Sequence, residues 1–242
     1  MNHLNDRELQ DEIIRYLTEP AARVVPTTAL VPEQAARAAH FARFLERRFY
    51  RDRLGRSFRY SAMLANGNGH RAIEVVDAEE FNRVVSREAM GSLAAAQRIG
   101  TLAVEHLTGL RGEAWWSALL DYEHAHFLQT ATSESAHRRQ HPRRGLSTVC
   151  RQFDWHLPEL LQRIKAKQPM DDAGNLHRPV TLLFSRTHAG KIFVMEVDAA
   201  TAAVFSAVDG ARSVAEISEL TKMPLLVVEE IVQSLREVGA VA

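Results

Sequence analysis

The sequence has few of the features that mark secreted, membrane-bound or disulfide-stabilised proteins. Its 242 residues include a single cysteine, Cys150, so no disulfide can form within the chain. No apolar run approaches the length that a membrane-spanning helix needs. The polar N-terminus lacks the apolar region of a signal peptide. We therefore expect a cytoplasmic protein.

An excess of basic residues is also absent. The 30 Lys and Arg residues balance 30 Asp and Glu residues, whereas proteins that live on nucleic acid usually carry a basic surplus that neutralises phosphates. The hydrophobic fraction of 46% and the charged fraction of 25% are ordinary for a soluble globular protein. At roughly 100–200 residues per domain, the length allows one large domain or two small ones.

The first part of the chain shows only helical patterns. Apolar residues recur at helical spacing over residues 32–45, 78–85, 93–107 and 115–130, and Pro32 suits the first position of a helix. Residues 137–145 contain no apolar side chain and predict an exposed linker. We therefore expect an α-helical docking domain over residues 1–145.

The remainder, residues 146–242, is expected to begin with a linker helix over residues 157–167 and then to change character. Val180–Ser185 and Lys191–Val197 predict two strands of a hairpin. Three short helices follow, marked by the following signals: Asp198 as a cap, Asp209-Gly210 as a stop, Ser213 and Glu216 as a capping box, Pro224 as a start and Gly239 as a stop. The overall fold class predicted is α+β, with an all-α domain followed by a winged-helix-like domain.

A hairpin with three helices can serve DNA binding or peptide binding. The third helix offers one positive and three negative side chains beside Gln233, namely Arg236, Glu229, Glu230 and Glu237, and this surface would repel a phosphate backbone. A strand with an unpaired edge can instead accept an extended peptide as an additional strand. Alternation along Lys191–Val197 also fits two sets of buried strand residues, so the pattern alone leaves both interpretations open.

Residues 197–217 carry a family resemblance. The segment Val-Asp-Ala-Ala-Thr-Ala-Ala-Val-Phe-Ser-Ala-Val-Asp-Gly-Ala-Arg-Ser-Val-Ala-Glu-Ile, with the later Leu235-Arg-Glu-Val-Gly239, resembles the PqqD-type precursor-peptide recognition element. The resemblance covers residues 180–242. The sheet of that family has a further strand, for which this sequence offers no secure position.

The resemblance implies that the leader of a ribosomally made precursor peptide binds between the last strand and the last helix. Carried over to this chain, the predicted peptide-binding residues are Lys191, Ile192, Phe193, Val194, Met195, Glu196, Val197, Val228, Ile231, Val232 and Leu235.

The order of the parts resembles a more particular group. A helical region, then Phe-Asp-Trp-His-Leu-Pro-Glu-Leu-Leu over residues 153–161, then the recognition element, is similar to the TglI-type partner subunits of multinuclear non-heme iron oxidases in the 3-thiaglutamate pathway. By this resemblance, a TglH-like companion holds the iron and oxidatively removes the β-carbon of a cysteine at the end of a carrier peptide. The present chain would bind that peptide, with no cofactor and no catalytic residue of its own.

A predicted helix in the first domain combines arginines with aromatic residues. The set comprises Arg37, Arg43, Arg47, Arg48, Arg51, Arg53, Phe41, Phe44, Phe49 and Tyr50. Arginine and aromatic residues are enriched at protein interfaces, so the helix can be a docking surface; a solvated basic helix face explains the arginines equally well.

The metal-binding alternative rests on Glu123 and His126. Their i, i+3 spacing is the Glu-x-x-His pattern of di-iron helical bundles, but such bundles need the motif from two helices, and no second copy occurs. We therefore expect His126 to be a buried, hydrogen-bonded histidine, with a metal-dependent enzyme as the runner-up. Cys150 is interpreted as a small buried apolar residue rather than a nucleophile.

Overall fold

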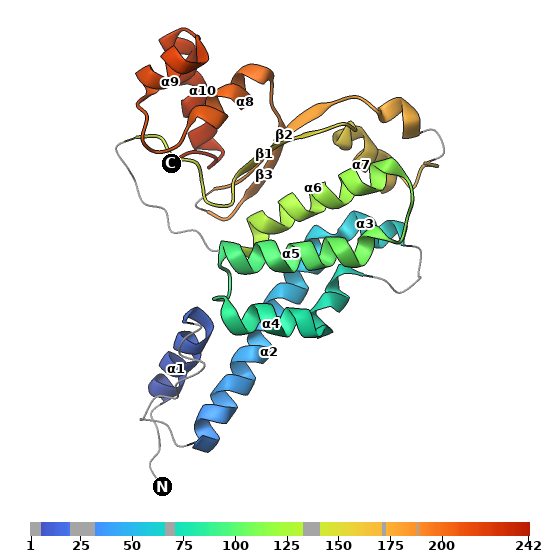
Figure 1. The fold of residues 1–242 in the computed structure, drawn as a ribbon, viewed down its shortest axis with the longest axis vertical. Helices are drawn as coiled ribbons and strands as arrows, with labels where there is room; N and C mark the ends of the chain where they lie inside the picture. The colour runs from blue at the N-terminus through green and yellow to red at the C-terminus, as the bar shows by residue number, and fades with distance from the viewer. Residues whose placement is uncertain (1–5, 20–31, 66–70, 133–140, 171–172, 188) are drawn as a thin grey trace.

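The computed structural model describes residues 6–19, 32–65, 71–132, 141–170, 173–187 and 189–242 (Figure 1). The fold is mixed α+β, mostly helical, with one small antiparallel sheet. The helical part contains α1 (Asp6–Thr18), α2 (Pro32–Ser57), α3 (Arg59–Leu64), the 3-10 helix η2 (Ala72–Asp77), α4 (Glu79–Arg87), α5 (Leu93–Thr108) and α6 (Ala114–Ala131). The remainder contains β1 (Val149–Phe153), α7 (Leu157–Lys165), the 3-10 helix η3 (Ala173–Leu176), β2 (Val180–Arg186), β3 (Ile192–Glu196), α8 (Ala199–Ala207), α9 (Val214–Thr221) and α10 (Leu225–Glu237).

Helix α6 is the centre of the helical part. It packs against α2, α3 and α5 on one side and against the sheet on the other. Helix α5 approaches α6 closely at Gly100, because glycine has no Cβ; a Cβ at this position would overlap the His124 ring of α6. The helices predicted over residues 78–85, 93–107 and 115–130 are confirmed as α4, α5 and α6, with ends shifted by one or two residues.

The sheet has the order β1-β2-β3, and both pairs of strands are antiparallel. The central strand β2 is buried on both faces. Leu182 and Phe184 join the core built on α6, where Tyr122 meets Phe184 edge to face, whereas Leu183 joins a second core formed with α8, α9 and α10. The sheet therefore lies between α6 and the three C-terminal helices (Figure 1).

The hairpin predicted from residues 180–185 and 191–197 is confirmed as β2 and β3. The further strand that the sequence did not locate is β1, which pairs with β2 from Val149↔Phe184 to Phe153↔Val180. Arg151 and Gln152 interrupt the apolar alternation of this segment. Pairing with β2, a contact between segments distant in sequence, stabilises it as a strand.

Residues 137–145 were expected to form an exposed linker. Residues 137–140 lie outside the described residues, and residues 141–145 are not a free linker but pair with the end of the chain. Pro142 is buried, the Arg143 N–H donates to the Ala242 carbonyl at 3.3 Å, and the Gly145 N–H donates to the Ala240 carbonyl at 3.1 Å. Backbone groups form such bonds whatever the side chains are, so a polar composition did not reveal this pairing. The described chain contains no helix with the length and apolarity to span a membrane.

Candidate peptide-binding groove

Strand β3 is an edge strand whose outer side has no strand partner among the described residues. The Val197 N–H donates to the Thr181 carbonyl at 3.0 Å, which fixes the alternation of this pair. Since antiparallel residues point their backbone groups alternately toward and away from the neighbour, the N–H and C=O groups of Ile192, Val194 and Glu196 point away from β2. Three residues of β3 therefore present unpaired backbone groups at an open edge.

A cavity of about 410 Å³ opens between the end of β3 and helix α10. Its lining comprises an apolar set and a polar set drawn from β3, the start of α8 and α10. The residues are Met195, Glu196, Val197, Asp198, Thr201, Glu230, Ile231, Ser234, Leu235 and Val238. Apolar side chains of a strand added to β3 would reach this cavity.

The spacing between α10 and the sheet is set at the helix C-terminus. Gly239 adopts a φ of +73°, and a Cβ at this position would overlap the backbone of Arg186 and Thr187 at the end of β2. The Ser185 hydroxyl also donates to the Val238 carbonyl at 2.8 Å. The close approach at Gly239 and the Ser185 hydrogen bond place the end of α10 against the end of β2, beside the cavity.

The structure brings five of the predicted peptide-binding residues to the cavity: Met195, Glu196, Val197, Ile231 and Leu235. Met195 is the most open apolar residue among them, with 40% of its surface exposed. The residues Lys191, Ile192, Phe193 and Val194 continue along the open edge away from the cavity, and the Lys191 ammonium lies 4.6 Å from the centre of the Phe193 ring. Peptide contact by these nine residues stays a prediction.

Val228 and Val232 do not line the cavity. Both are buried in the second core with Leu235, because positions at i, i+4 and i+7 face the same side of a helix. Apolar spacing in α10 marked its core face; the cavity lies against the adjacent stripe of Glu230, Ile231 and Ser234 and against Leu235 at the end of the core face. The prediction that Val228 and Val232 contact the peptide directly is therefore corrected: both are core residues of α10.

Apart from Glu196, the polar lining residues were not predicted from the sequence. Asp198 caps α8, where its carboxylate accepts the Thr201 N–H at 2.7 Å, and Glu230 and Ser234 of α10 are followed at the same spacing by Val238 at the helix C-cap. The spacing of these three residues was present in the sequence, but nothing there showed that their stripe meets β3.

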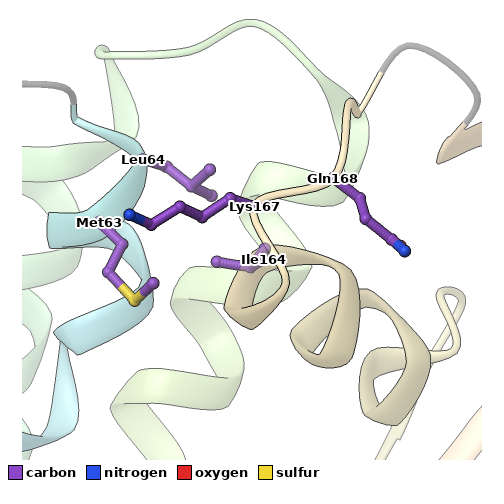
Figure 2. Close-up of a pocket in the computed structure, with 5 residues that line it drawn as sticks. All are labelled: Met63, Leu64, Ile164, Lys167 and Gln168. Carbon is purple, nitrogen blue, oxygen red and sulfur yellow. The ribbon is translucent and has the colours of Figure 1, made fainter.

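A second cavity of about 500 Å³ lies between α3 and α7. Figure 2 shows Met63 and Leu64 on one side, Ile164 on the other, and the Lys167 side chain extending across between them. Met63 has 44% of its surface exposed. This cavity has no sheet edge among its lining residues and hence offers no row of backbone groups to an extended peptide.

Glu123, from the metal-like motif, performs a structural task. It is fully buried, and its Oε1 accepts the N–H groups of Tyr60 at 2.6 Å and Ser61 at 3.1 Å, at the start of α3. Burial raises the pKa of the Glu123 carboxyl to about 7, against the opposing effect of these hydrogen bonds. The carboxyl group satisfies backbone donors that the short helix leaves unpaired.

The neighbouring histidines are held in the same packed region. His126 Nδ1 lies 3.2 Å from the Ser57 hydroxyl, so the expected hydrogen bond is present, but the side chain is half-buried and not fully buried as expected. Burial lowers the pKa of His126 to about 4 and also lowers the pKa of His124, so both rings favour the neutral form. In the described ranges, no three His, Cys, Asp or Glu side chains are arranged to hold a metal ion.

Cys150 is half-buried and packs against the second core. Burial raises the pKa of its thiol, whereas a nucleophilic cysteine needs a lowered pKa. The expectation of an apolar packing role is therefore supported.

No protein-family model matches the chain, and no curated protein is significantly similar to it in sequence.

Proposed function

We propose that this chain is a non-catalytic partner subunit of a heteromeric oxidase. It binds a ribosomally made precursor, or carrier, peptide and presents the C-terminal cysteine of that peptide to a TglH-like multinuclear non-heme iron oxidase. The companion holds the iron and removes the cysteine β-carbon in 3-thiaglutamate-type natural product biosynthesis. In this proposal the described hairpin and α8–α10 act as a winged-helix-like recognition element of the PqqD type.

The observation that carries the proposal is the open edge of β3 beside an apolar cavity on α10. Backbone groups at such an edge supply affinity for any extended peptide, and a neighbouring cavity selects side chains. The exposed face of α10 includes Glu229 and Glu230, which favours a peptide over DNA as the ligand, because carboxylates repel phosphates.

Helix α2 supports the docking part of the proposal. Phe41 and Phe44 are 48% and 51% exposed, and their rings stack with centres 6.1 Å apart. Arg43 and Arg48 on the same helix are exposed as well. By contrast, Tyr50 is buried and Phe49 lies under the Arg53 guanidinium, 3.3 Å from its ring centre. Exposed aromatics beside arginines are typical of the centre of a protein interface, so Phe41 and Phe44 are the proposed contact with the companion.

The proposed contribution to the reaction is positional. A peptide held at one end reaches the active site of the companion at a high effective concentration, without any new contact to the reacting cysteine. The companion alone should therefore turn the peptide over slowly, and this chain alone should not turn it over.

The test is calorimetric titration of the purified chain with the precursor peptide encoded beside it. We expect micromolar or tighter binding that Met195→Asp abolishes, because the substitution places a charge in the apolar cavity. Met63→Asp is the matched control: the residue is exposed to a similar extent but lies in the other cavity, so binding should persist.

Absence of binding to the chain alone directs the same titration to the complex with the companion. If the complex also fails to bind, or if both substitutions weaken binding equally, the groove between β3 and α10 is not the peptide site and the proposal is wrong.

A further inference from the structure

The two faces of β3 differ in chemistry. The register Leu183↔Met195 and Leu182↔Glu196 places Met195 on the face of α8–α10, with Leu183, and Glu196 on the opposite face, with Leu182. Val194 shares the face of Glu196 and packs against the core built on α6. A strand added to β3 would alternate in the same way, so its consecutive side chains would meet different surroundings.

The negative charge of the Glu196 carboxylate is little offset by neighbouring cations. Its side chain is 61% exposed, and its ion-pair partner among the described residues is His156, whose Nε2 lies 3.8 Å from Oε2, beyond hydrogen-bond distance. Position 196 also directs its backbone groups outward, so a residue paired with it on an added strand would stand directly beside this carboxylate.

The cavity face is also acidic at its margin. Asp198 and Glu230 line the cavity, and no lysine or arginine is among the lining residues. Asp198 already accepts a backbone N–H of α8, whereas Glu230 lies exposed on α10. The cavity therefore combines apolar lining residues with carboxylates at its edge. Such a site favours a peptide in which an apolar side chain stands next to a basic one.

We propose that the segment bound to β3 contains an apolar residue followed or preceded directly by a lysine or arginine. The apolar residue enters the cavity beside Met195, and the basic residue pairs with Glu196 on the other face of the sheet. This inference rests on the proposed peptide-binding function and adds the chemical class of peptide. The open edge supplies binding to extended peptides in general, and Glu196 supplies the preference for a cation.

The test is selection of a random decapeptide display library on the immobilised full-length chain at low salt, with the Met195→Asp chain used to remove peptides that bind elsewhere. We expect the Met195-dependent peptides to carry Lys or Arg next to an apolar residue. Selection on the Glu196→Lys chain should keep the apolar preference and exchange the basic residue for Asp or Glu.

One selected peptide then gives the quantitative comparison. Changing its basic residue to Glu should weaken binding to the wild-type chain about tenfold, and Glu196→Lys should restore it. Glu229→Lys is the control for general charge effects: it lies on α10 but does not line the cavity, and should change the affinity by less than about twofold.

The outcomes separate the two proposals. If no peptide is selected in a Met195-dependent way, the groove itself fails, and the proposed function with it. If Met195-dependent peptides show no basic preference, or if the charge exchange does not restore binding, only the inference about Glu196 is overturned.

Discussion

Replacing Glu123 by glutamine should remove a pH dependence that this buried carboxyl imposes on the stability of the fold. Its pKa is about 7 in the folded chain, against 4.5 for an ordinary glutamate. Between these two pH values the unfolded chain releases the proton and the folded chain retains it. The free energy of unfolding therefore falls as the pH rises from 4.5 to 7, and the effect levels off above 7.

The size of this effect follows from the two pKa values. Each tenfold change in proton affinity corresponds to about 1.4 kcal/mol, so the carboxyl contributes a loss of about 3 kcal/mol across the interval. His126 acts in the opposite direction, because its pKa of about 4 in the folded chain lies below its ordinary value and acid therefore destabilises the fold through it. Subtracting the values for Glu123→Gln from those for the wild-type chain removes the contribution of His126.

The measurement is urea unfolding of both chains at several pH values from 5 to 8, followed by the fluorescence of the buried Trp115 and Trp116. Relative to the wild-type chain, Glu123→Gln should become more stable as the pH rises from 5 to about 7, and the difference should level off above that pH. Glutamine can still accept one backbone N–H, so any constant difference reflects lost hydrogen bonding and not ionisation. A difference that is independent of pH would refute the assignment of a protonated, structural carboxyl.

Three other predictions concern the contact of α10 with β2, the cap of α9 and the docking surface on α2. Gly210→Ala should lower the free energy of unfolding by about 1–2 kcal/mol, because the backbone at this position is left-handed and only a flexible arginine side chain lies beside the new Cβ. Gly239→Ala should lower it by at least about 3 kcal/mol, because backbone atoms of β2 must also move. Equal losses for the two variants in urea unfolding would contradict the anchoring role of Gly239. Ser213→Ala should lower the stability by about 1 kcal/mol, measured by thermal unfolding, since the serine forms a capping box at α9; an unchanged Tm would show that the cap contributes nothing. Replacing Phe41 and Phe44 together by serine should weaken the complex with the companion at least about tenfold in surface plasmon resonance and leave peptide binding by the chain alone unchanged; an undiminished complex would place the docking surface elsewhere.

Local patterns in the sequence predicted the elements whose stability is largely local. The capping box of Ser213 and Glu216 marked the start of α9, and period-two alternation marked β2 and β3. Strand β1 escaped prediction because its partner lies about thirty residues away and its own residues do not alternate cleanly.

The candidate site divides in the same way. Sequence pattern and family resemblance indicated the strand and the helix that form the groove, and Met195 and Ile231 among its residues. They also assigned Val228 and Val232 to it, because helical spacing shows which residues share a face but not which face meets the core. The acidic margin at Asp198 and Glu230 became visible only when α10 was placed against β3.

The sequence by itself thus determined the α+β class, the hairpin, the helix caps and the balance of charge, since each depends on neighbours along the chain or on composition alone. The tertiary structure alone decided that β3 has an open edge, that a cavity lies between β3 and α10, and that Glu123 is buried at the start of α3. Each of these features depends on contacts between segments far apart in sequence, whose geometry no local pattern contains.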